Sequence, residues 1–129
     1  MFVGRIERKV DSLGLFRVPT KWFKAAGENK VVYVMPDPEE VCLRLIPSRT
    51  MDARLAKLRE RAGNDPETNQ VLLTIGAVVE QLKVDDEGCI EISHKLRDFA
   101  GIKQRLVMVG GEWYTQLWSP RELRRRGEK

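Results

Sequence analysis

The stretch KVDSLGLFRVPTKWFKAAG, residues 9–27, decides the fold because the chain contains it twice. A shift of 74 residues lays it over KVDDEGCIEISHKLRDFAG, residues 83–101. The identical pairs are Lys9 and Lys83, Val10 and Val84, Asp11 and Asp85, Gly14 and Gly88, Lys21 and Lys95, Ala26 and Ala100, and Gly27 and Gly101. A unit that occurs only twice predicts one pseudo-symmetric domain, since solenoids need about three or more repeats.

The residue pattern of each copy predicts a strand, a tight turn, a second strand, a short helix and a closing hairpin. In the first copy we expect strands over 1–10, 15–18, 31–35 and 42–46, and a helix over 21–26 between the N-cap Thr20 and Gly27. In the second copy we expect strands over 78–84, 89–92, 105–109 and 114–118, and a helix over 95–100 capped by Ser93.

The turns contain Asp11 and Gly14 in the first copy, and Asp85 and Gly88 in the second. An aspartate carboxylate can accept hydrogen bonds from nearby backbone N–H groups, and glycine takes up the positive φ that such turns need. We interpret all four as turn-forming residues, and we favour this over a paired-carboxylate site for the two aspartates.

Two helices are expected between the copies. The first covers residues 50–62, with apolar residues at helical spacing and Gly63 as the stop. The second starts at Asp65 and Pro66, a strong N-terminal signal, and carries Val71, Leu72 and Ile75 on one side. This helical pair should pack outside the β structure or against a neighbouring subunit. The charged tail, 121–129, is expected to be frayed or helical.

These patterns predict a mainly β fold with helices, of the α+β class, as one domain over residues 1–129. The copies cover about 1–47 and 79–120, and the helical linker about 48–77. An isolated hairpin is marginally stable and has exposed edges, so pairing the copies into a small barrel or split sheet would bury both apolar faces.

Composition indicates a globular protein in a reduced, cytoplasmic setting. The 129 residues carry a net charge of +4, and there is neither an apolar run of about 20 residues nor a signal-peptide pattern. Cys42 and Cys89 form no disulfide framework, and a single histidine, His94, cannot build a histidine metal cluster or a triad. We therefore expect no cofactor and no enzymatic activity. Cys42 is expected in the core, and Cys89 as an inert filler.

Charge is unevenly distributed between the copies. Residues 1–30 carry seven basic against three acidic side chains, whereas residues 80–103 carry four basic against six acidic ones. The tail from Arg121 carries five basic and two acidic residues. A polyanionic partner would therefore meet the first copy and the tail.

The chain resembles the MraZ family along essentially its whole length. The resemblance rests on Met1-Phe2-x-Gly4, on Asp11-Ser12-x-Gly14 followed by Val18-Pro19, on Asp85-x-x-Gly88, and on Leu117-Trp118. It implies a duplicated swapped-hairpin, AbrB-like double-split barrel with a two-helix insertion. It also implies a ring-shaped homo-oligomer and a nucleoid-associated, DNA-binding regulator of the bacterial division and cell-wall gene cluster.

The sequence departs from the family pattern directly after each turn glycine. The family has an arginine there, and this chain has Leu15 and Cys89. Arg17 lies two residues beyond Leu15 and therefore on the same strand face, whereas its second-copy counterpart is Glu91. We expect one half of the protein to contact double-stranded promoter DNA. The expected contacts are Arg17, Lys21, Lys9, Arg5 and Arg8.

Alternatives remain open. Lys9 could equally protect a strand edge from pairing. The fold could also serve as an oligomeric protein-interaction or scaffold module that has lost DNA binding, since both family arginines are absent. A third possibility is an antitoxin-like partner protein, as AbrB-type barrels also serve that role by resemblance. A membrane is not expected as a partner.

Overall fold

The computed structural model describes residues 4–19, 21, 30–63, 65–111 and 113–127. The elements within them are β1 (Arg5–Lys9), β2 (Leu15–Arg17), β3 (Val31–Pro36), β4 (Leu43–Pro47), α2 (Ser48–Ala62), α3 (Pro66–Val78), β5 (Glu80–Lys83), β6 (Cys89–Glu91), α4 (His94–Ala100), β7 (Arg105–Gly110), β8 (Thr115–Trp118) and α5 (Pro120–Gly127). The fold is mixed α and β, as predicted, with antiparallel strand pairing. No helix in these ranges has the length and apolar composition needed to span a bilayer.

The two turns have the same hydrogen bonds. The Oδ1 atom of Asp11 accepts from backbone N–H groups two and four residues later, each at 2.9 Å, and Asp85 does the same. Gly14 and Gly88 have φ values of +89° and +82°, a region that favours glycine. Each turn therefore combines a carboxylate acceptor with a positive-φ glycine.

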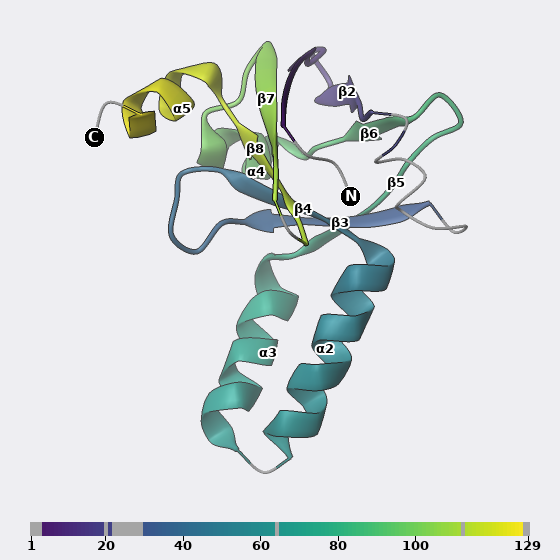
Figure 1. Cartoon of the computed structure of the whole chain (residues 1–129), viewed down its shortest axis with the longest axis vertical. Helices are drawn as coiled ribbons and strands as arrows, with labels where there is room; N and C mark the ends of the chain where they lie inside the picture. The colour runs from purple at the N-terminus through teal and green to yellow at the C-terminus, as the bar shows by residue number, and fades with distance from the viewer. Residues whose placement is uncertain (1–3, 20, 22–29, 64, 112, 128–129) are drawn as a thin grey trace.

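The strands of the two copies pair with each other. A six-stranded sheet has the order β1-β7-β8-β4-β3-β5, and a two-stranded ribbon is formed by β2 and β6 (Figure 1). The first strand of each copy thus lies beside the third strand of the other, β1 beside β7 and β5 beside β3. The matching last strands, β4 and β8, pair with each other.

One apolar cluster joins both copies. It takes alternate residues from the strands, as expected for a sheet with one buried face, together with residues of α4. The buried residues are Val10, Phe16, Val18, Val32, Val34, Leu43, Leu45, Val84, Ile90, Ile92, Leu96, Ala100, Ile102, Leu106, Met108 and Leu117. A hydrophobic cluster shared in this way means that neither half has a separate core within the described residues.

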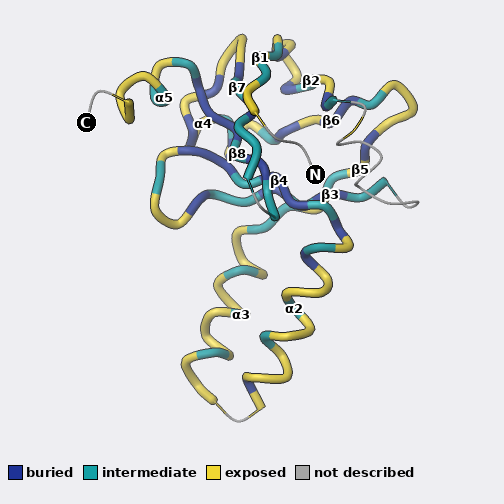
Figure 2. Tube along the Cα trace, in the orientation of Figure 1, coloured by how far each residue is buried: buried dark blue, intermediate teal, exposed yellow. Residues whose placement is uncertain are grey.

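Helices α2 and α3 form a hairpin that projects from the sheet (Figures 1 and 2). Of α2, only Ser48, Met51 and Ala62 are buried, and no residue of α3 is buried. Leu73 is 68% exposed and Val71 is 48% exposed. Within the ranges that the structure describes, no further layer covers this apolar helix.

Most predicted elements are present, with shifted ends. Helix α2 begins at Ser48 rather than at residue 50, and the strand expected from 78 begins at Glu80 because α3 continues to Val78. The Asp65 cap is confirmed, since its side chain accepts from the N–H of Glu67. The tail is helical over α5. The helix expected over 21–26, with Thr20 and Gly27, lies outside the described residues except for Lys21.

Candidate nucleic-acid interface

The five basic residues predicted to contact DNA do not share one surface. Along β1, Arg5 and Lys9 point to the outer side of the sheet, whereas Arg8 lies on the side that packs against the core. Arg17 on β2 is exposed, and so is Lys21. The structure brings Arg8 to Arg17 but leaves Arg5 and Lys9 on a separate strand face.

The outer face of β1 and β7 holds a further cation. Arg105 lies directly across from Lys9 in the strand register. Its Nη1 atom is 3.4 Å from Oε1 of Glu7, and both side chains are more than half exposed. Sequence reasoning did not single out Arg105, because its position opposite Lys9 depends on pairing between residues about one hundred positions apart.

The outer face of the β2–β6 ribbon carries four side chains. Arg17 lies opposite Cys89, and Leu15 lies opposite Glu91. The central residue of each strand is buried in the core, so these four residues lie on the other side of the ribbon, where Arg17 and Glu91 are exposed and Cys89 is buried. This surface presents one exposed guanidinium, that of Arg17, to an anionic partner. The carboxylate of Glu91 lies on the same side, two residues along β6 from Cys89, which is the residue opposite Arg17.

Arg8 contacts the ribbon through its side chain. Its Nε atom donates a 3.0 Å hydrogen bond to the backbone carbonyl of Arg17. Arg8 is half-buried, and Leu82 takes the matching position in the second copy. The guanidinium of Arg8 therefore ties β1 to the end of β2 and adds positive charge beside Arg17.

The residues at the positions of the family arginines also have a structural role, which depends on the backbone N–H and not on the side chain. Leu15 and Cys89 donate their backbone N–H groups to Asp11 and Asp85. Because residues 15 and 89 take part in these bonds only through their backbone N–H groups, the turn is retained when the arginine side chain is absent.

The thiols do not form a reactive site. Burial, reinforced by the nearby Asp37 carboxylate, raises the pKa of Cys42 to about 12, so this thiol stays protonated at neutral pH. Its predicted place in the core is confirmed. Cys89 is also buried, at 9% exposure. No group of histidine, cysteine or acidic side chains able to hold a metal ion occurs among the described residues.

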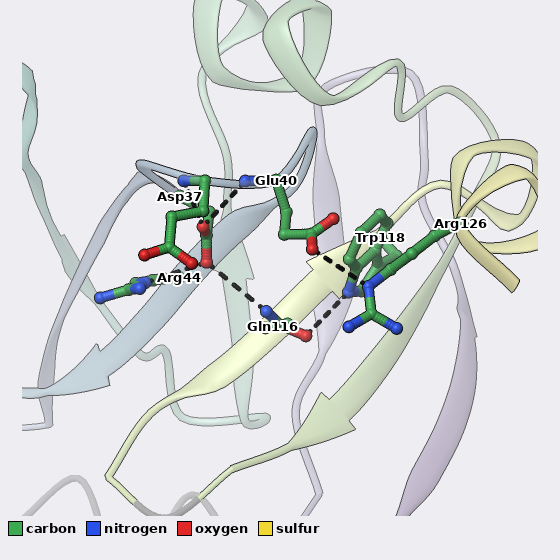
Figure 3. Close-up of polar contacts among 7 residues, drawn as sticks. Asp37, Glu40, Arg44, Gln116, Trp118 and Arg126 are labelled. Carbon is green, nitrogen blue, oxygen red and sulfur yellow. Dashed lines mark hydrogen bonds and ion pairs between the residues drawn. The ribbon is translucent and has the colours of Figure 1, made fainter. Parts of the chain in front are cut away.

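A buried polar network lies on the outer side of β4 and β8 (Figure 3). Asp37 accepts hydrogen bonds from Arg44 Nε at 3.0 Å and from Gln116 Nε2 at 3.5 Å, and Gln116 accepts from Trp118 Nε1 at 3.0 Å. Burial alone would raise the pKa of Asp37, but the Glu39 N–H bond and the Arg44 guanidinium outweigh it and lower the pKa. Sequence reasoning did not single out Asp37, because its side-chain partners come from two strands, β4 and β8.

These features define a small α+β protein whose candidate site is a basic strand surface. No family model matches the chain. Curated proteins named "Transcriptional regulator MraZ" are similar over most of it. The protein of Lachnoclostridium phytofermentans is 31% identical over 119 residues, which cover 92% of this chain and 82% of that protein. Those of Thermomicrobium roseum and Corynebacterium jeikeium are 26% and 25% identical, also over more than nine-tenths of this chain.

The chain belongs to the MraZ family.

Proposed function

We propose that the protein is a DNA-binding transcriptional regulator that acts as a homo-oligomer on repeated promoter sites of the division and cell-wall gene cluster. The observation that carries this proposal is the exposed Arg17, which shares the outer face of the β2–β6 ribbon with Leu15, the position of the family arginine. The curated relatives are named as transcriptional regulators and not as enzymes.

Two groups of cations would contact the duplex. Arg17, with Arg8 beside its carbonyl and with the exposed Lys21, forms the first. Arg5 and Lys9 form the second, together with Arg105 across the strand pair. An arginine can bind a phosphate or a guanine edge with two parallel hydrogen bonds, whereas a lysine acts as a point charge. Arg17 is therefore the residue proposed to carry sequence preference.

We infer a single domain, built from the copies at 1–47 and 79–120 and the linker at 48–77, with a swapped-hairpin, AbrB-like barrel. The exchanged pairing of β1 with β7 and of β5 with β3 supports it, since each copy completes the sheet of the other.

Helix α3 is the proposed contact between subunits. Val71 and Val78 of α3 are seven positions apart and therefore lie on one helix face, and both remain exposed in the single chain. Exposed apolar surface of this kind marks association sites. A ring of subunits would place several weak DNA contacts along one duplex and multiply their affinities. Such a regulator would work in the cytoplasm, at the nucleoid.

Fluorescence anisotropy with the duplex upstream of the protein's own gene tests the proposal. Arg17→Ala should weaken binding roughly tenfold and lower the salt slope by about one, because one phosphate or base contact is lost. Lys57→Ala on the exposed face of α2 removes the same charge far from the ribbon and is the matched control. Equal affinities of Arg17→Ala and the unaltered protein would overturn the role of Arg17.

The alternative is an oligomeric protein-interaction module without DNA binding. It is favoured by Leu15 and Cys89 at the family arginine positions and by Glu91 on the same ribbon face. The same titration decides between the two: a stable oligomer by light scattering, with no anisotropy change at 50 mM salt, would establish the scaffold.

A further inference from the structure

The C-terminal helix α5 carries a cationic stripe. Arg121, Arg124 and Arg125 occupy positions i, i+3 and i+4, which lie on one face of a helix, and all three are exposed. Leu123 and Glu122 lie toward the protein and are half-buried. The helix is therefore docked by one side and presents arginines on the other.

The docked side is fixed by specific contacts. Ser119 Oγ accepts a 3.0 Å hydrogen bond from the Glu122 N–H at the start of the helix. Arg126 Nε lies 3.3 Å from Oε1 of Glu40, and its guanidinium lies 5.9 Å from the centre of the Trp118 ring (Figure 3). These contacts tie α5 to the β3–β4 loop and to the end of β8.

The same helix lies on the outer side of the sheet. Trp118 is opposite Val107, which alternates with the core residues Leu106 and Met108 and so faces outward. Arg105 is two residues from Val107 on the same face. The stripe on α5 therefore shares the outer side of the sheet with Arg105, and with Arg5 and Lys9 on β1.

We propose that α5 is a second, sequence-independent nucleic-acid contact, in which Arg121 and Arg124 bind backbone phosphates. The inference rests on the proposed DNA-binding function and extends it to a part of the chain outside the repeat. Arg125 is partly neutralised by Glu122, at 3.2 Å. Within the described ranges, neither Arg121 nor Arg124 has an ion-pair partner, so both charges are available to an anion.

A phosphate backbone fits this helix better than a membrane surface does. Helices that bind in the bilayer interface insert an apolar face below their cationic one. The apolar residue of α5 is Leu123, and it is half-buried against the protein. Charge without exposed apolar surface matches a partner that is recognised by phosphates alone.

The test uses the full chain with the double variant Arg121→Gln/Arg124→Gln. Its binding is titrated from 50 to 300 mM salt on two 30-base-pair duplexes, the protein's own upstream region and a random sequence. Loss of two phosphate contacts should lower the salt slope by about 2 and weaken binding roughly 10- to 60-fold at 0.1 M salt. Both duplexes should weaken in the same proportion, because phosphate contacts carry no sequence information.

The matched control, Arg59→Gln/Arg61→Gln, removes the same charge from exposed positions on the last turn of α2, at the far end of the molecule (Figure 1). An equal loss in this control would mean that only net charge matters and would overturn the contact. An unchanged slope in the α5 variant, with binding intact in the parent, would overturn the contact alone. No binding by the parent protein would remove the proposed function and the contact together.

The last measurement is binding of the protein and of the double variant to vesicles of phosphatidylserine and phosphatidylcholine. Vesicle binding that depends on Arg121 and Arg124, with an unchanged DNA slope, would assign the stripe to an anionic lipid surface and overturn the inference.

Discussion

In the first copy, strand β2 presents Arg17 to solvent, whereas strand β6 of the second copy presents Glu91 at the matching place. Their backbones are nevertheless equivalent. The Gly14 carbonyl accepts from Ile92 N–H at 3.0 Å, and the Gly88 carbonyl accepts from Val18 N–H at 2.9 Å. Turn chemistry thus fixes the main chain of both copies and leaves their outer side chains free to carry different charge.

The largest effect that tests the equivalence of the backbones is expected at Gly14. A Cβ there would collide with the carbonyl oxygen of Ile92, at a φ of +89° that side chains rarely adopt. Gly14→Ala should therefore lower the free energy of unfolding by about 3 kcal/mol or more, measured by urea denaturation. Gly76→Ala, in open space on α3, should instead stabilise by about 0.5–1 kcal/mol. An unaltered midpoint for Gly14→Ala would show that the close approach of the turns is not required.

The second effect concerns a difference between the closing hairpins. The first hairpin has a loop over 37–42 with the buried Asp37, and the second has a shorter loop over 111–114. Asp37→Asn should cost about 2 kcal/mol at pH 7, because the Arg44 guanidinium loses its carboxylate.

The pH dependence of that cost has a definite sign. Because the folded-state pKa of Asp37 is lowered, its contribution is complete above the unfolded value, about 3.9, and is lost as pH falls through the folded value. The difference between the two proteins in urea should therefore shrink below about pH 4. A difference independent of pH down to pH 2 would contradict the role of the charge.

The third effect compares the turn aspartates directly. Asp11→Ala and Asp85→Ala each remove an acceptor of two backbone hydrogen bonds at an exposed turn, and each should cost about 1–2 kcal/mol. The asparagine variants keep one oxygen acceptor and should lose less. Thermal unfolding of the four proteins measures this, and a loss in only one copy would break the equivalence of the two turns.

Much of this fold was predictable because the repeat and its turn residues are local signals. Asp11, Gly14, Asp85 and Gly88 mark turns that the structure contains. The exchange of strands between copies could not be read from residue patterns, because apolar alternation fixes which face is buried and leaves the neighbour open. For the same reason Arg105 and the partners of Asp37 escaped prediction.

The sequence showed only in part which of the predicted site residues lie on the same surface. Arg5, Arg8 and Lys9 are neighbours along the chain, but strand alternation puts Arg8 against the carbonyl of Arg17 and the other two on the outer face. The tail was recognised as basic, but its arginine stripe depends on the helix docking through Glu40 and Trp118.

The smallest predicted effect tests the contrast between the two strands of the ribbon, β2 and β6. Glu91→Arg would place a guanidinium on β6 where β2 has Arg17, and should strengthen binding to the upstream duplex roughly three- to eightfold with a salt slope steeper by about 1. Glu91→Gln removes the repulsion without adding a contact, so it should give a smaller gain and a nearly unchanged slope. Glu60→Arg, exposed on α2, controls for net charge. If Glu60→Arg and Glu91→Arg gave the same gain in affinity, the ribbon would not be the DNA-facing surface. A gain in affinity confined to Glu91→Arg would mean that both copies face the duplex and that only their side chains differ.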